Sequence, residues 1–235
     1  MEKYYSIKDN HNDELVNIFT NPEFKNISVI ENGFHTVNNV LHDCILFISV
    51  NPSLKDDSKK NEYYDLPKTK NETFQENGSS SFFSKFFEIA QYYDKETSCS
   101  HLDLLVFRNT NQSDIDSILN EKSGPKFIMS QLEISKKIME VIKPKIIVVC
   151  NSKSRIFLGF DKSKDKNVNV WMDYDFEFKE ELGTYIITNS GSKLHNTPVF
   201  FSSMLNGQRA LDKGSFRRLI WHINAVKNKN ELIKK

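Results

Sequence analysis

Polar residues follow three apolar runs of the chain, at the point where each run ends. Asn51 comes directly after Ile45–Val50, Arg108 follows Leu102–Phe107, and Ser202 closes a third, shorter run. Amide, guanidinium and hydroxyl groups of this kind can position a water or stabilise developing charge. Continuous apolar runs are typical of parallel strands buried on both faces, and the carboxyl ends of such strands meet at one edge, where ligands bind. The sequence therefore predicts a ligand site at this edge.

The segments between these runs are predicted to be helices, so strands and helices alternate along the chain. Lys145–Cys150 reads as a further buried strand, and Pro198–Ser202 as a short last one. The predicted helices are Phe82–Tyr93, Ser113–Lys122, Lys126–Ile142, Ser152–Leu158 and Ser215–Val226. This order predicts an α/β protein, a three-layer α/β/α sandwich around a short, mostly parallel four-stranded sheet. We expect one domain over residues 1–235, with a polar, helical extension at 1–43 and an acidic, hairpin-like insertion at 161–190.

Composition excludes several classes of protein. Thirty-two Lys and Arg residues oppose 31 Asp and Glu residues, and this formal net charge of +1 excludes indiscriminate coating of DNA but not a local basic face. The three cysteines form no CxxC pair, so neither a metal site nor a disulfide framework is expected. No run reaches the roughly 18 apolar residues of a membrane span. We expect a cytoplasmic protein without a cofactor, monomeric by default.

The ordered motifs resemble those of the uracil-DNA glycosylase superfamily, most closely its mismatch-specific branch. The matching segments span Ile45 to Val226 and occur in the family's order: ILFISVNPS, SSFFSKFFEIAQ, LDLLVFRNT, IKPKIIVVCNSKSRIFLG and PVFFSSMLNGQRALDKGSFRRLIWHI. The resemblance implies one glycosylase-like domain that flips a base out of DNA and hydrolyses its N-glycosidic bond.

The first motif of the resemblance implies a water site and a base pocket. Asn51 would position the hydrolytic water, while Pro52 and Ser53 would shape the pocket and approach a phosphate. A flipped base needs an aromatic residue to stack on. Phe74 has the best spacing for this role, with Tyr64 and Tyr63 as alternatives. Two simpler interpretations remain open: Asn51 caps a turn before Pro52, and the phenylalanines of the predicted helix at Phe82–Tyr93 pack in the core.

The second motif departs from the family at Asp103, where many members have an asparagine that reads the polar edge of uracil. An amide donates and accepts hydrogen bonds, whereas an ionised carboxylate only accepts them. We therefore predict that the protein does not prefer plain uracil but a base with an exocyclic amine, which a glycosylase assay on both kinds of base would test. Alternatively, Asp103 lies outside the pocket, paired with Arg108 or Lys145.

The last motif lacks the histidine that stabilises the departing base in many members, and Ser202 is left as a hydrogen-bond donor. The following loop suits insertion into DNA, with Met204 or Leu205 as a wedge. The predicted DNA contacts are Ser203, Met204, Leu205, Asn206, Gln208, Arg209, Arg217 and Arg218. A plain turn at Gly207 is the alternative. Salt-sensitive DNA binding, weakened by neutralising Arg209, Arg217 and Arg218, is the expected result.

Three functions remain in view at this point. A DNA glycosylase that acts on an unusual, damaged or deaminated base is the leading hypothesis. A catalytically weak sensor that binds DNA or a modified base is the alternative, favoured by the missing histidine and by Asp103. A hydrolase of a small nucleoside-like molecule is the third, and the wedge loop and basic C-terminal segment argue against it.

Overall fold

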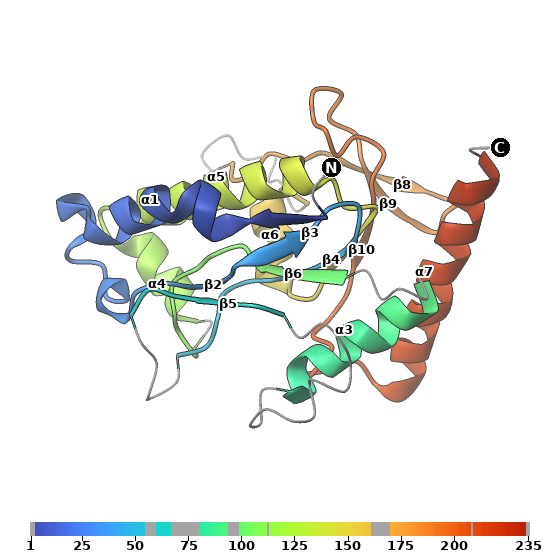
Figure 1. Cartoon of the computed structure of the whole chain (residues 1–235), viewed down its shortest axis with the longest axis horizontal. Coiled ribbons are helices and arrows are strands. Elements are labelled where there is room, and N and C mark those ends of the chain that lie inside the picture. The colour runs from blue at the N-terminus through green and yellow to red at the C-terminus, as the bar shows by residue number, and fades with distance from the viewer. Residues whose placement is uncertain are drawn as a thin grey trace.

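One mixed sheet runs through the centre of the protein, described here from a computed structural model (Figure 1). The structure describes residues 3–54, 60–66, 80–93, 99–111, 113–160, 170–207 and 209–233. The six strands, in their order across the sheet, are β6 (Cys99–Asp103), β4 (Ile45–Ser49), β7 (Ile146–Val149), β10 (Pro198–Phe201), β9 (Thr184–Ile187) and β8 (Phe176–Lys179). The first four are parallel, and the last two join antiparallel. The α/β class is confirmed, but the sheet has six strands rather than the predicted four.

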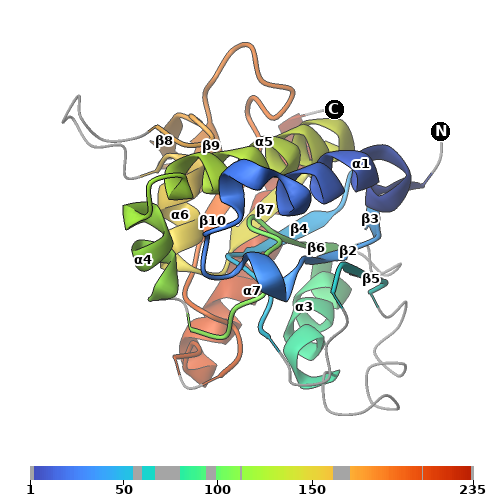
Figure 2. The ribbon, with the colours of Figure 1, turned by 90° about the vertical axis from the view of Figure 1, so that its left-hand side faces the viewer.

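Helices cover both faces of this sheet. Successive side chains of its apolar central strands point to opposite faces, so each strand contributes to two cores. Leu46 and Ile48 belong to a core that includes residues of α1 (Ile7–Thr20) and α5 (Gly124–Ile142). Phe47 lies on the other face, in a core shared with residues of α3 (Ser80–Tyr93) and α7 (Lys213–Ile233). In Figures 1 and 2, α1 and α5 lie side by side above the sheet, and α3 lies below it. In Figure 1, α7 packs against α3 and rises along the right-hand side of the molecule. None of the described helices has the length and apolar character to cross a membrane.

The second strand of the sheet begins and ends earlier than predicted. The apolar run predicted a strand at Leu102–Phe107, but β6 pairs with β4 only as far as Asp103, which lies opposite Ser49. Beyond it, Leu104 N and Leu105 N still donate to the carbonyl oxygens of Ser49 and Val50, at 3.1 and 2.9 Å. The Gln131 side chain of α5 then accepts hydrogen bonds from Val106 N at 2.9 Å and Phe107 N at 3.2 Å, and so satisfies two backbone donors of this segment. The shift puts Asp103 at the carboxyl end of the strand.

The N-terminal segment packs on the central domain through α1 and two small sheets. β1 (Tyr4–Ser6) pairs antiparallel with β3 (Asn39–Leu41), and β2 (His35–Val37) pairs parallel with β5 (Glu62–Tyr64). Short 3-10 turns lie at Pro22–Phe24 and Ile30–Asn32. Leu15 of α1 is completely buried. The segment is therefore part of the core rather than a mere extension, and α1 lies within the part predicted to be helical.

The hairpin predicted within 161–190 is present as β8 and β9, and it extends the main sheet. Two short segments predicted to be helical are helices in the structure, namely α4 (Asp114–Asn120) and α6 (Ser152–Leu158). Gly183 closes the hairpin with a φ of +65°, a left-handed conformation that favours glycine. A Cβ at this position would lie 3.0 Å from Nε2 of His222 on α7. The turn is thus fitted closely against α7.

A prediction for stability concerns Gly124, the first residue of α5. A Cβ there would lie 1.6 Å from the carbonyl oxygen of Ile118, so Gly124→Ala must displace the backbone of α4 or of α5. We expect a loss of about 1–3 kcal/mol in the free energy of unfolding, measured by urea titration. Gly191→Ala is the control, because a Cβ at that position meets nothing within 4 Å. Equal stabilities for the two variants would contradict the close packing of α4 on α5.

Candidate functional site

Asn51 is fixed at the carboxyl end of β4 by its own side chain. Its Nδ2 donates to the carbonyl oxygens of Asn109 at 2.7 Å and Pro52 at 3.1 Å. Its Oδ1 is buried and accepts no hydrogen bond from any described residue. A buried acceptor without a donor is costly, so such a group in a native site calls for a water or ligand partner. The amide is held in one orientation with its oxygen available.

The other residues of the first motif have different surroundings. Pro52 is buried, and its carbonyl oxygen also accepts from Asn109 N at 3.0 Å. Ser53 is exposed. Phe74, the predicted stacking residue, lies outside the described residues. The interpretation that Asn51 caps a turn holds in part. Its Nδ2 closes the turn, but its Oδ1 takes no part in it.

Asp103 ends β6 on the neighbouring strand and is only 6% exposed. Its Oδ1 lies 3.7 Å from Nε2 of His101. Burial raises the pKa of the Asp103 carboxyl to about 8. Neither alternative partner takes this place: Arg108 forms an ion pair with Glu62 at 3.3 Å, and Lys145 precedes β7 at the opposite edge of the sheet.

The raised pKa changes what Asp103 can read. Below about pH 8 the carboxyl is protonated, so it offers one O–H donor and one acceptor, as an amide does. The prediction that this residue only accepts hydrogen bonds therefore holds only at higher pH. At neutral pH the protonated carboxyl gives no reason to exclude uracil, and the preference for a base with an exocyclic amine stays a prediction.

A buried polar chain lies beside Asp103. His101 Nε2 is 3.0 Å from Oγ of Ser49, and its Nδ1 is 3.0 Å from the hydroxyl of Tyr64. Phe83 and Phe86 of α3 pack against the imidazole, with ring centroids 5.6 and 5.5 Å away. Burial lowers the pKa of His101 to about 3 and raises that of Tyr64 well above its usual value. The histidine is therefore neutral, and the Tyr64 hydroxyl is engaged with it.

Sequence reasoning missed His101 and Ser49, although a signal existed. Polar residues at every second position of an otherwise apolar strand share one face. His101 and Asp103 have this spacing, and Ser49 lies opposite Asp103 in the sheet. The side chains of Phe83 and Phe86 pack there, as the core interpretation of this helix predicted.

Ser202 and its neighbours line a hollow at the ends of β7 and β10. Ser202 N donates to Val149 O at 2.8 Å, which continues the pairing of these strands by one residue. The hollow has a volume of about 290 Å³. Its lining is polar and basic, formed by Val149, Asn151, Ser152, Arg155, Phe201, Ser202, Ser203, Met204 and Arg209. Arg155 is a member that sequence reasoning did not select.

The wedge loop is only partly as predicted. Leu205 is 5% exposed and packs in the core with α7, so it cannot insert into DNA, whereas Met204 lines the hollow. Asn206 is partly exposed. Gly207 has a φ of +88°, and Leu211 N donates back to Met204 O at 2.9 Å, so a turn is present here. Gln208 lies outside the described residues.

The two adjacent arginines of α7 face different neighbours. Arg217 reaches α3, where it contacts the Tyr92 hydroxyl at 3.4 Å and the Glu88 carboxylate at 3.9 Å. Arg218 lines a second hollow that also includes Ser202 and Ser203. Both arginines stay predicted DNA contacts, and only Arg218 lines one of the hollows.

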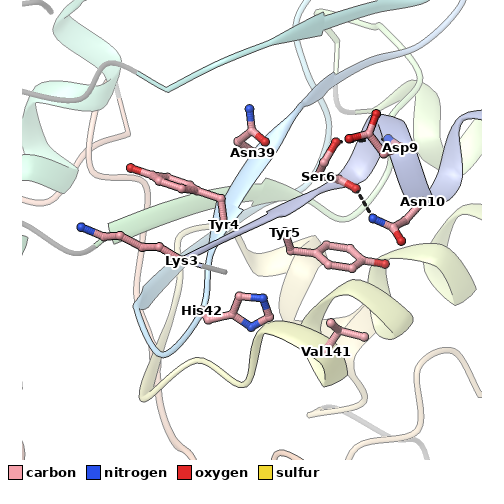
Figure 3. A pocket seen from close by; sticks show the side chains of 9 residues that line it. All are labelled: Lys3, Tyr4, Tyr5, Ser6, Asp9, Asn10, Asn39, His42 and Val141. Carbon is pink, nitrogen blue, oxygen red and sulfur yellow. Dashed lines mark hydrogen bonds between the residues drawn. The ribbon is translucent and has the colours of Figure 1, made fainter. Parts of the chain in front are cut away.

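A wider hollow of about 850 Å³ lies at the other end of the sheet. Figure 3 shows its lining from β1, β3, the start of α1 and Val141 of α5. One of its polar side chains is used locally: Asn10 Nδ2 donates to Ser6 O at 2.7 Å. His42 of this hollow precedes β4, whereas Asn51 follows it. This hollow is separate from the candidate site.

Comparison with known proteins adds no assignment. No protein-family model matches the chain, and no curated protein matches its sequence. Within the described part of the chain, no group of three or more His, Cys, Asp or Glu side chains could hold a metal ion. The site must be interpreted from its own geometry.

Proposed function

We propose that this chain is a DNA glycosylase-like protein that flips an unusual, damaged or deaminated base out of DNA and hydrolyses its N-glycosidic bond. The observation that carries the proposal is the Asn51 amide, whose nitrogen is doubly held and whose buried oxygen has no described donor. An oxygen fixed in this way accepts a hydrogen bond from a water and directs the water's lone pair. The resemblance of the surrounding motifs to the uracil-DNA glycosylase superfamily supports the same role.

Strands β6 and β10 would supply the other groups that the reaction needs. Asp103, one strand away from Asn51, would hydrogen-bond the polar edge of the flipped base. As the bond to the sugar breaks, the sugar becomes oxocarbenium-like and the base departs with negative charge. Water held by Asn51 attacks the anomeric carbon and loses one proton, and the base anion takes up one proton as it leaves. Ser202 donates a hydrogen bond toward the departing base. A fixed donor at such a position stabilises the charge more than bulk water would.

A second function, a sensor that binds DNA without cleaving it, is favoured by where the histidines lie. Nε2 of His222 on α7 is hydrogen-bonded to the carbonyl oxygen of Leu182 at 2.7 Å. His195 precedes β10, at the end opposite Ser202. Neither residue replaces the histidine missing from the last motif. A loss of one charge-stabilising donor costs roughly 100-fold or more in rate.

A panel of oligonucleotides, each with one odd base, separates these functions. The enzyme hypothesis predicts alkali-labile sites at one or a few of these bases after incubation with the full chain. Binding across the panel without cleavage would support the sensor. An absence of both binding and cleavage would contradict the two DNA functions together and favour a small nucleoside-like substrate.

A further inference from the structure

Strand β8 forms one edge of the main sheet, and no described segment pairs with its outer side. The strand at the opposite edge, β6, is covered. Each of its residues is buried, and Leu41 N of β3 donates to Ser100 Oγ at 2.8 Å. In β8, by contrast, Glu177 and Phe178 are exposed, and Figure 2 shows the strand on the left-hand side of the molecule, beyond β9. An uncovered edge strand is a template for pairing with another chain.

The backbone groups of Phe176 and Phe178 point outward from this edge. Thr188 N, which follows β9, donates to Asp175 O at 2.9 Å, so the carbonyl of Asp175 faces the β9 side. In an antiparallel pair this direction alternates along the strand, so Glu177 also faces β9 and the two phenylalanines face away from it. No hydrogen bond from the described part of the chain reaches these outward groups. The N–H and C=O groups of both residues are therefore available to a partner strand.

The two faces of β8 carry different chemistry. Glu177 and Lys179 are two residues apart and share one face, where their side chains form an ion pair at 2.6 Å. Phe178 points to the opposite face and is 49% exposed. Its ring centroid lies 5.2 Å from that of Tyr185 on β9, so the ring is supported from one side. One negative and one positive residue thus flank an exposed ring, and this pattern can complement itself.

One register allows β8 to pair favourably with the β8 strand of a second copy, antiparallel across a two-fold axis. With the axis at Phe178, Glu177 of each copy lies directly opposite Lys179 of the other. Opposite charges in such cross-strand pairs stabilise a sheet, and like charges destabilise it. An axis at Phe176 would set Glu177 against Asp175, and an axis at Glu177 or at Lys179 would set that residue against itself. The charges therefore select the register centred on Phe178, whose outward N–H and C=O groups then bond to those of its own copy.

We propose that the outer edge of β8 is a docking surface for a second copy of this chain, which pairs with it antiparallel through Phe178. The six-stranded sheets of the two copies then form one continuous sheet. The contact uses the same surface on both copies, so it closes with two chains. A strand of four residues gives a small interface, for which we expect a dissociation constant of about 10–100 μM. The inference replaces the monomer expected by default, and it does not depend on the proposed function.

Charge exchange tests this interface, with the full chain followed by sedimentation from about 5 to about 500 μM. Wild-type protein should pass from monomer to dimer over this range. Glu177→Lys and Lys179→Glu each set like charges against one another in both cross-strand pairs, and should weaken association at least about tenfold. A mixture of these two single variants should associate again, because each charge of one then meets the opposite charge of the other. The double variant Glu177→Lys/Lys179→Glu keeps the ion pair within the strand and should dimerise like wild type.

An exposed aromatic residue elsewhere on the surface supplies the control for the ring. Phe178→Ser should weaken the dimer, whereas Trp221→Ser, at a position on α7 that is 71% exposed, should not. Wild-type protein that stays monomeric over the whole range would overturn the inference. Equal association by wild type and both single charge variants, a mixture or double variant that does not recover, or equal effects of Phe178→Ser and Trp221→Ser would do so as well. Growth beyond a dimer would also contradict a contact that closes with two chains.

Discussion

Asn51→Ala is expected to lower the single-turnover rate of base excision at least about 100-fold while DNA affinity changes less than about twofold. The reason is that the buried Oδ1 is the group we assign to the hydrolytic water, whereas the arginines that we propose as DNA contacts lie on other segments. The substitution also leaves the carbonyl oxygens of Asn109 and Pro52 without the Nδ2 donor. We therefore expect stability to fall by about 1–2 kcal/mol, which chemical unfolding will measure.

A control for this variant is available on the same edge of the sheet. The side chain of Asn111 is exposed and donates to Asp114 at 2.9 Å, so it has no part in the proposed chemistry. Asn111→Ala should leave the excision rate within about twofold of wild type. A similar loss of rate in both variants would show that the edge as a whole, rather than the Asn51 oxygen, had been disturbed.

Asp103→Asn is expected to stabilise the protein above neutral pH. The folded protein keeps the Asp103 proton up to about pH 8, whereas an ordinary aspartate in the unfolded chain loses it near pH 4. The unfolded state thus binds fewer protons between these values, and wild-type stability falls as pH rises. An asparagine does not ionise, so its advantage over wild type should grow by about 1 kcal/mol per pH unit through this window and level off above pH 8.

The titration of His101 limits the pH range in which wild-type stability can be seen to fall because of Asp103. Its folded pKa of about 3 lies below the ordinary value near 6.5, so its contribution is fully present above pH 6.5 and is lost as pH falls toward 3. The two effects oppose each other between about pH 4 and 6.5. Urea titrations at pH 5, 6.5, 8 and 9 should show a fall from 6.5 to 8 that Asp103→Asn removes. Parallel curves for the two proteins would contradict a buried, neutral Asp103.

The sequence predicted strands best where a strand is buried on both faces, because such a strand must be an almost entirely apolar run. The runs at Ile45–Val50 and Lys145–Cys150 are apolar except at Ser49 and Lys145, as a strand between two helical layers requires, and they became β4 and β7. The run at Leu102–Phe107 is apolar except at Asp103 but is buried for another reason. Its last residues are satisfied by the Gln131 side chain from α5, a contact between segments that no local pattern encodes.

The candidate site was predictable in its place but not in its chemistry. Asn51, Asp103 and Ser202 do end neighbouring or nearby strands at one edge. The protonation of Asp103 could not be predicted, because it depends on burial beside His101 and under α3. Leu205 was misassigned for a similar reason: a leucine in a loop looks available in the sequence, yet it packs in the core.

The most direct test of the proposed function is the release of a free base, measured by mass spectrometry under single-turnover conditions at pH 7. Wild-type protein, incubated with the odd-base panel, should release one free base for each abasic site that it leaves in intact DNA, and Asn51→Ala should release it at least about 100-fold more slowly. Release at the same rate by both proteins, or no release from any member of the panel, would contradict a glycosylase that works through Asn51.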